Sequence, residues 1–160
     1  MQDHRKLEIW KMACLLAIGV RAATDRFPKR GYAELKEQLI SAAESIANTI
    51  VEGCGAETQK EFARFLQVSI KSNREVEGEL AMAYGYRIVS EKRWQALTDY
   101  TVLLRKKTYT LRKKVLSSPD SNGRKAKRIR RRQSNSKPRT PNGKLQTGKP
   151  SNPEPETPEP

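Results

Sequence analysis

The sequence predicts an all-α protein: an antiparallel up-down four-helix bundle in residues 1–116, followed by a disordered basic C-terminal tail in residues 117–160. Two observations predict this fold class. Apolar residues recur at spacings of three and four over most of the first part, as they do in helices that bury one face. No segment alternates apolar and polar residues in the way a half-buried strand does. Short connections then make neighbouring helices antiparallel.

The first predicted helix spans about residues 5–24 and ends before Phe27-Pro28, because proline disfavours a continuing helix. Between Ile9 and Val20 the only charged residue is Lys11, so apolar side chains lie nearly all round this helix. A helix with one face in water carries more polar residues. The helix is therefore either central in its own bundle or packed against another subunit. For a domain of this size we favour the second arrangement.

The second predicted helix spans about residues 32–51, and Gly53 follows as a plausible C-terminal cap. Besides its core stripe, this helix has a second face of small polar residues, which permit a close helix approach or a polar interface. The core stripe consists of Leu35, Leu39, Ala42, Ala43, Ile46 and Ile50. The polar face consists of Ser41, Ser45, Asn48 and Thr49.

The third predicted helix spans about residues 58–84 and opens on the capping-box pattern Thr58-x-x-Glu61. Its core face consists of Phe62, Phe65, Leu66, Ser69, Asn73, Val76, Leu80 and Tyr84. A buried Asn73 needs a hydrogen-bond partner, or it costs stability. The opposite face is a basic stripe of Lys60, Arg64, Gln67, Lys71 and Arg74. Nearby glutamates could neutralise this stripe through i,i+4 pairs, so a partner-binding face and an ordinary solvated face both remain open.

The fourth predicted helix spans about residues 91–116, with Ser90 as N-cap. Its expected core face consists of Leu97, Tyr100, Leu104, Leu111 and Val115. The helix ends in two basic triplets seven residues apart, Arg105-Lys106-Lys107 and Arg112-Lys113-Lys114. Cations near a helix C-terminus are favourable against its dipole, but six of them exceed what capping needs. A continuous positive surface is the better account.

The whole chain is basic, with a net charge of +14 divided equally between residues 1–116 and residues 117–160. Such a charge favours a polyanionic partner, nucleic acid first and an anionic membrane surface second. The tail holds a basic cluster at residues 124–132, a Pro/Glu-rich end at residues 153–160, and almost nothing that could be buried. No secretory signal or membrane-spanning run is recognisable. We therefore expect a cytoplasmic protein with reduced thiols.

Catalysis is poorly supported by the sequence. His4 is the only histidine and lies near a terminus that we expect to fray, which argues against a Ser-His or Cys-His arrangement. Glu75 and Glu79 are four residues apart, but no Glu-x-x-His motif accompanies them, so we interpret them as a solvated face rather than a metal site. Cys14 is expected in the core, and nothing marks Cys54, expected in a loop, as activated. The sequence predicts a non-enzymatic protein without cofactor or metal.

Three ordered motifs resemble a known family. They are Leu7-Glu8-Ile9-Trp10-Lys11 followed by Phe27-Pro28, then Ser45-Ile46-Ala47-Asn48-Thr49-Ile50-Val51-Glu52-Gly53, then Lys60-Glu61-Phe62-Ala63-Arg64-Phe65-Leu66 followed by Glu75-Val76-Glu77. Through them, residues 4–116 resemble the bacterial four-helix-bundle family of proteins encoded in intervening sequences of 23S ribosomal RNA genes. The same family includes the accessory variability determinants of diversity-generating retroelements. The tail lies outside the resemblance.

This resemblance implies an up-down four-helix bundle that is often assembled as a ring of five subunits. For the retroelement branch it also implies binding to a reverse transcriptase and to nucleic acid during template copying. The chain departs from the family pattern in the third helix. Where members often carry a small or apolar Gly-Ser-Leu-Ala-type run, this chain has Lys71, Ser72, Asn73 and Arg74. Two positions of the basic stripe are thus not explained by the shared bundle pattern.

We predict an oligomeric nucleic-acid-binding accessory protein, by resemblance a homopentamer, that assists a retroelement reverse transcriptase and binds RNA or an RNA/DNA hybrid. The alternative is a protein of the intervening-sequence type that binds RNA without a retroelement role. A membrane-surface scaffold is disfavoured, because the tail offers little apolar surface. The expected nucleic-acid contacts are Lys60, Arg64, Lys71, Arg74, Arg105, Lys106, Arg112, Lys113, Arg124, Lys125, Lys127, Arg128, Arg130, Arg131 and Arg132.

Overall fold

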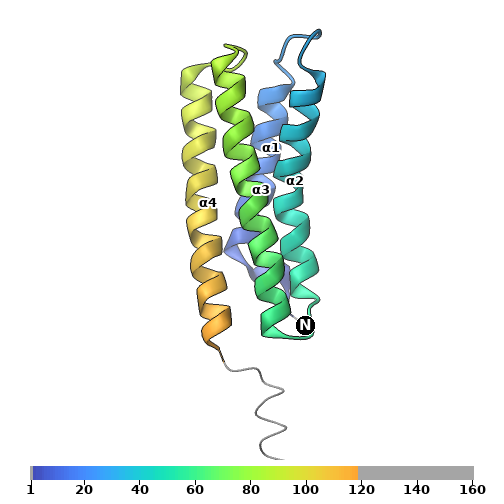
Figure 1. Cartoon of the computed structure of the whole chain (residues 1–160), viewed down its shortest axis with the longest axis vertical. Helices are drawn as coiled ribbons and strands as arrows, with labels where there is room; N and C mark the ends of the chain where they lie inside the picture. Colours follow the sequence, from blue (N-terminus) through green and yellow to red (C-terminus); the bar gives the residue numbers. More distant parts are fainter. Residues whose placement is uncertain (1, 119–160) are drawn as a thin grey trace, which may run out of the picture. The chain divides into compact units, whose positions relative to one another are not determined.

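Four antiparallel helices make up the part of the chain that the computed structural model describes, residues 2–118 (Figure 1). The short 3-10 helix η1 (His4–Lys6) precedes α1 (Glu8–Thr24), α2 (Ala33–Cys54), α3 (Gln59–Gly85) and α4 (Glu91–Ser117). Both α1 and α3 pack against α2 and α4, so the helices surround one core in chain order. The all-α up-down bundle is confirmed, and residues 2–118 contain no strand. The predicted tail and its basic cluster lie outside the described residues.

The start of α3 confirms the predicted cap, with one difference in the reciprocal bond. The backbone N–H of Glu61 donates to Oγ1 of Thr58 over 3.1 Å, which satisfies a donor that the helix cannot satisfy itself. The Glu61 carboxylate accepts from the backbone N–H of Glu57 over 3.2 Å, rather than from that of Thr58. The capping signal therefore placed the helix start correctly.

The N-terminus is held in place, so the expected fraying is wrong. The backbone N–H of Gln2 donates to the carbonyl oxygen of Cys54 over 3.0 Å. The Asp3 carboxylate caps η1 by accepting from the backbone N–H of Arg5 over 3.0 Å. His4 then packs edge-on against Trp10, with ring centroids 4.8 Å apart. The bond from Gln2 to Cys54 joins residues far apart in the chain, so the local sequence pattern does not show it.

The predicted cap at Gly53 is wrong, because α2 continues to Cys54 and Gly55 is the C-cap. Gly53 is instead a point of close approach between α2 and α3. A Cβ atom built on it would lie 2.8 Å from the Cβ of Phe65 and 2.9 Å from a ring carbon of Phe62, closer than packed carbon atoms come. Cys54 is accordingly buried in the last turn of a helix and does not lie in a loop.

The core faces predicted for the second and third helices are largely confirmed. All six residues of the α2 core stripe are buried. On α3, six of the eight predicted residues are buried, whereas Phe65 is half-buried and Tyr84 is 37% exposed. Of the predicted polar face of α2, Ser45 meets α3, where its hydroxyl lies 3.0 Å from that of Ser72, whereas Ser41 and Asn48 are exposed. Small side chains thus line the contact between these two helices.

The core face of α4 is rotated relative to the prediction. Leu104 and Val115 are buried as expected, but Leu97, Tyr100 and Leu111 are only half-buried. Two threonines are buried with them: the Oγ1 atoms of Thr101 and Thr108 donate to the carbonyl oxygens four residues earlier, over 2.7 Å and 2.9 Å. A hydroxyl satisfied by its own helix can enter the core at little cost. A pattern search for large apolar residues does not find such positions.

Asn73 is fully buried at the centre of the bundle and is only partly satisfied. Its Nδ2 donates to the carbonyl oxygen of Ser69 over 2.8 Å. Its Oδ1 has no hydrogen-bond partner within residues 2–118. The hydrogen-bond partner that a buried asparagine needs is therefore present for the amide N–H of Asn73 and absent, within residues 2–118, for its amide oxygen.

One face of α1 is buried, and the opposite face is also apolar. Met12, Leu16 and Val20 face the core, whereas Leu15 is 61% and Ile18 is 66% exposed. The helix is therefore not central in its own bundle, which removes one of the two explanations for its composition. No helix within residues 2–118 is long and apolar enough to span a bilayer.

Candidate nucleic-acid interface

The basic stripe of α3 lies in solvent and is free of counter-charges. Lys60, Arg64, Lys71 and Arg74 are all exposed. None of them forms an ion pair within residues 2–118, so the neutralisation that the nearby glutamates could have provided does not occur. These cations are available to an external anion.

The four predicted contacts on α4 divide into two kinds. Lys106 and Lys113 are exposed, like the stripe on α3. Arg105 and Arg112 are half-buried and hold α4 against α3. Arg105 makes a two-pronged contact with Glu77, in which Nε and Nη2 lie 2.6 Å and 3.3 Å from the two carboxylate oxygens. Nε of Arg112 donates to the carbonyl oxygen of Ala63 over 3.3 Å.

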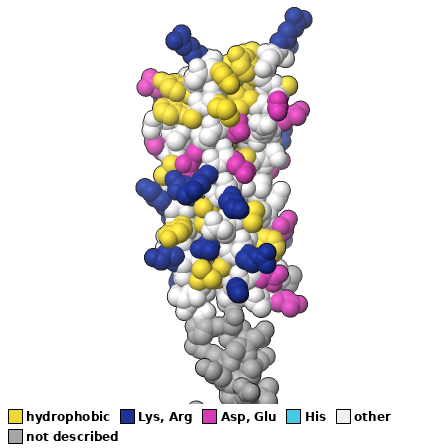
Figure 2. Space-filling view, viewed as in Figure 1, with side chains coloured by type: hydrophobic (Ala, Val, Ile, Leu, Met, Phe, Trp, Pro, Cys, Tyr) yellow, Lys and Arg dark blue, Asp and Glu magenta, His cyan; other side chains and the backbone are white. Residues whose placement is uncertain are grey.

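The exposed cations of α3 and α4 therefore form one surface, which we call the basic face: Lys60, Arg64, Lys71, Arg74, Lys106 and Lys113. The contacts of Arg105 with Glu77 and of Arg112 with Ala63 set residues 63–77 of α3 beside residues 105–112 of α4. Figure 2 shows Lys and Arg gathered over the lower half of the bundle on this side, where α3 begins and α4 ends. The predicted cations of the tail lie outside the described residues.

The positive charge extends round α4 into a groove against the start of α1, which sequence reasoning missed. This groove has a volume of about 430 Å³ and an apolar floor that includes Leu7, Ile9 and Leu111. Four lysines line it: Lys6, Lys106, Lys107 and Lys114. Only Lys107 is paired, with its Nζ 2.7 Å from the carboxylate of Glu8. The available signal in the sequence was Lys6, which the fold brings to the lysines of α4.

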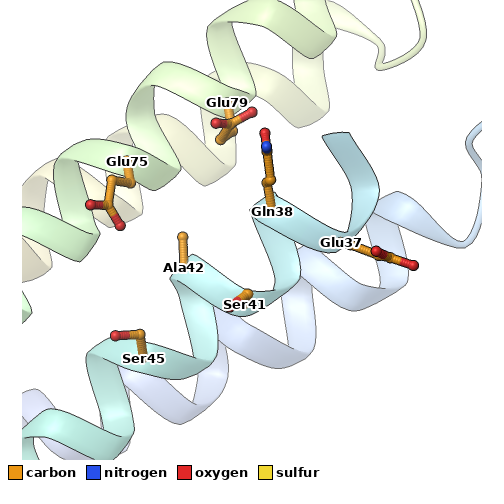
Figure 3. Close-up of a pocket in the computed structure, with 7 residues that line it drawn as sticks. All are labelled: Glu37, Gln38, Ser41, Ala42, Ser45, Glu75 and Glu79. Carbon is orange, nitrogen blue, oxygen red and sulfur yellow. The ribbon is translucent and has the colours of Figure 1, made fainter. Parts of the chain in front are cut away.

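Negatively charged side chains dominate the surface between α2 and the second half of α3 (Figure 3). A groove of about 620 Å³ there is lined by Glu37, Gln38, Ser41, Ala42, Ser45, Glu75 and Glu79. Burial raises the pKa of Glu79, and the neighbouring Glu75 and Glu34 carboxylates raise it further. The described residues contain no group of three or more His, Cys, Asp or Glu that could hold a metal ion. α3 thus has a basic half and an acidic half, and an anion is attracted only to the first.

The two thiols show no sign of activation. Cys14 is half-buried and Cys54 is buried, and both are free. Burial raises the pKa of both thiols, and for Cys54 the Asp3 carboxylate adds to this effect. A raised pKa reduces the thiolate fraction and with it the nucleophilicity.

These features define a small helical bundle protein with one strongly basic face. The family model of the 23S rRNA-intervening sequence proteins matches residues 5–110, and the chain belongs to this family. The resemblance drawn from the sequence motifs is therefore confirmed.

One similar solved structure is a protein of unknown function from the S23 ribosomal protein family of Bacteroides thetaiotaomicron. Its TM-score is 0.62 at 14% sequence identity, and the match covers 66% of this chain and 98% of that one. At this identity the likeness supports the fold alone. Among curated proteins the comparison finds no match.

Proposed function

We propose that the protein is an oligomeric accessory protein that binds RNA or an RNA/DNA hybrid through the basic face. The observation that carries this proposal is the set of six exposed cations on adjacent helices, none with a counter-charge within residues 2–118. Lysine and arginine contacts to phosphate release counterions and require no particular base sequence. The protein acts by binding rather than by catalysis.

Removing two cations from the centre of the basic face tests the proposal. Lys71→Ala with Arg74→Ala should weaken binding to a labelled single-stranded RNA. It should also reduce the slope of log K against log salt by about 0.7 per lost phosphate contact. The matched control is Lys29→Ala with Arg30→Ala, which removes the same charge from the exposed loop before α2. Fluorescence anisotropy at several salt concentrations measures both quantities. Equal behaviour of the two double variants would contradict the proposal.

The basic cluster of the tail is the second part of the proposed surface. Deleting residues 119–160 removes Arg124, Lys125, Lys127, Arg128, Arg130, Arg131 and Arg132. We expect weaker RNA binding and an unchanged helical circular dichroism signal, because the four described helices all end before residue 119. If RNA binding is unchanged, the cluster is not part of the surface and the contacts lie on α3 and α4 alone.

The outward apolar face of α1 supports the oligomeric part of the proposal. Removing Leu15 and Ile18 from water at a subunit contact would stabilise an assembly by about 1.5–3 kcal/mol for each side chain. We propose a ring of five subunits, the arrangement that the family resemblance implies. Such a ring would carry five basic faces, and an RNA that contacts several of them would bind more tightly than to a single subunit.

Light scattering tests the assembly. Leu15→Glu with Ile18→Glu should lower the molar mass to that of a monomer while the helical signal persists, because neither side chain belongs to the core. Met82→Glu, at an exposed apolar position on α3 (43% exposed), is the control and should leave the mass unchanged. A wild-type protein that is already a monomer would refute this part of the proposal.

The retroelement role is a finer proposal, supported by the family resemblance. It requires a reverse transcriptase that co-purifies with the protein, and a neighbouring reverse-transcriptase gene with paired template and variable repeats. The competing candidate is an RNA-binding protein of the intervening-sequence type, to which the family model points most directly. RNA binding without a reverse-transcriptase partner would favour this candidate.

A further inference from the structure

We propose that Tyr109 stacks on an unpaired base, so that the basic face takes single-stranded nucleic acid in preference to a duplex. This inference rests on the proposed function, since it specifies which nucleic acid the basic face accepts. It gives a binding role to Tyr109, an uncharged residue that cannot contribute to the charge of the basic face.

The first observation is the openness of the Tyr109 side chain. Tyr109 is 52% exposed on α4 and packs against no other aromatic ring of the described residues. The other exposed tyrosines have aromatic partners. The ring of Tyr84 is stacked on Trp94 at 4.4 Å between centroids, and Tyr86 lies 5.8 Å from Tyr32. Tyr100, the other candidate for stacking on α4, is half-buried.

The second observation is the place of Tyr109 within the basic face. Lys106 precedes it by three residues and Lys113 follows it by four, so all three lie on one side of α4. Along α4, Tyr109 lies between Arg105 and Arg112, the two residues that contact Glu77 and Ala63 of α3.

Lys71 and Arg74 lie between those same two contact points on α3. An open aromatic ring is thus flanked by cations from two helices. This combination of a positive track and a stacking platform is typical of single-strand binding.

The third observation is the position of the Lys113 ammonium group. Its Nζ lies 6.0 Å from the centroid of the Tyr109 ring, which is the outer limit of a cation–π contact. The ammonium lies over the ring at this outer distance, and Lys113 is exposed, so its flexible side chain can move aside when a base stacks on the ring. A base stacked on Tyr109 would bring its own phosphate within reach of this cation.

A duplex cannot use this arrangement. Its bases already stack on one another, so a tyrosine ring on the side of a helix meets only sugar and phosphate. Reading the groove of a duplex requires an element that enters it, and Tyr109 lies on the side of the long helix α4 (Glu91–Ser117) rather than at its end. Duplex binding to the basic face therefore depends on the cations alone.

Tyrosine substitutions in the full-length protein separate stacking from charge. The probes are a uridine homopolymer of about twenty nucleotides and an RNA hairpin with the same number of phosphates, whose two strands are joined by a non-nucleotide linker so that every base is paired. We expect Tyr109→Ala to weaken binding of the homopolymer by about fivefold or more, the lower range for a lost base–aromatic stack. Tyr109→Phe should bind like the wild type, because the ring stacks and the hydroxyl does not. Tyr86→Ala, at the other end of α3, is the matched control and should change neither affinity.

Binding of the hairpin decides between the outcomes. Unchanged hairpin affinity in Tyr109→Ala supports stacking, whereas an equal loss on both probes would mean that the substitution only disturbs phosphate contacts. Unchanged homopolymer affinity would overturn the stacking inference, while the proposed function survives if Lys71→Ala with Arg74→Ala still weakens binding. If that double variant binds both probes normally, the proposed function itself fails. Photocrosslinking of 4-thiouridine-labelled RNA to the peptide that contains Tyr109 gives an independent readout.

Discussion

Replacing Gly53 with alanine tests how closely α2 approaches α3. The new Cβ would lie 2.8 Å from the Cβ of Phe65, and 2.9 Å and 3.2 Å from two ring carbons of Phe62. The Cβ of Phe65 moves only with its backbone, and Phe62 is 5% exposed. Neither contact can therefore be relieved by a side-chain rotation alone, and we expect the two helices to move apart.

The size of the effect follows from two opposing terms. Alanine in a helix interior is favoured over glycine by about 1 kcal/mol, which is an upper bound for Gly53 because it lies in the last turn of α2. Forcing an extra methyl group into a close-packed contact costs about 1–3 kcal/mol. We therefore expect Gly53→Ala to lower the free energy of unfolding by about 1 kcal/mol, or at most to leave it unchanged.

Gly78→Ala is the matched control for this prediction. Gly78 is also inside a helix, and a Cβ there would meet nothing within 4 Å. This variant receives the propensity gain without the overlap, so it should be more stable than the wild type by up to about 1 kcal/mol. The difference between the two variants isolates the cost of the overlap, about 1–3 kcal/mol.

Urea denaturation followed by far-ultraviolet circular dichroism measures all three proteins. The protein concentration must be held fixed, because an assembly makes the apparent stability depend on it. If Gly53→Ala stabilises the protein as much as Gly78→Ala does, the close approach of α2 and α3 is refuted.

Four further predictions concern the ion pairs and the buried polar groups of the bundle. Glu77→Gln should lower the free energy of unfolding by about 1–2 kcal/mol, because it leaves the half-buried Arg105 without its counter-charge. Glu8→Gln, in a pair whose carboxylate is 70% exposed, should cost less than about 0.5 kcal/mol in the same urea titration. Asn73→Leu should raise the free energy of unfolding by about 1 kcal/mol, because it removes a buried acceptor without a partner among the described residues; a loss of stability would contradict this prediction. Glu79→Gln should stabilise the protein at pH 7, because burial and neighbouring carboxylates raise the pKa of Glu79 in the folded state. A raised folded pKa means that the folded protein favours the protonated form, so the advantage of the neutral glutamine should shrink as the pH falls through the raised pKa and should be lost below the ordinary glutamate pKa. A pH-independent difference in unfolding free energy would contradict this account.

The helices and most of their buried faces were predictable, because periodicity is a local property of the chain. A residue such as Leu39 or Leu66 recurs at helical spacing with its neighbours, and that spacing alone places it on the buried side. The Thr58 cap was predictable for the same reason, since its hydrogen bond spans three residues. The apolar outer face of α1 and the exposed basic stripe of α3 also follow from spacing.

The roles of individual polar side chains depended on which helices meet and in what register. Arg105 and Lys106 are adjacent in the sequence, yet one is paired with Glu77 and the other belongs to the basic face. Only the antiparallel alignment of α3 with α4 makes this distinction, because it brings residues 28 positions apart into contact.

The tertiary structure also decided where helices come closest and which ring stays open. Gly53 has the sequence context of a cap, but α3 lies against it, and the absence of a side chain permits that contact. The helical spacing placed Tyr100 on the core face and Tyr109 off it, but only the packed structure shows that Tyr109 stays in solvent without an aromatic partner among the described residues. The sequence alone determined the bundle and its basic character, because both follow from local spacing and composition. The surface available to a partner was decided by packing, because exposure depends on neighbours that are distant along the chain.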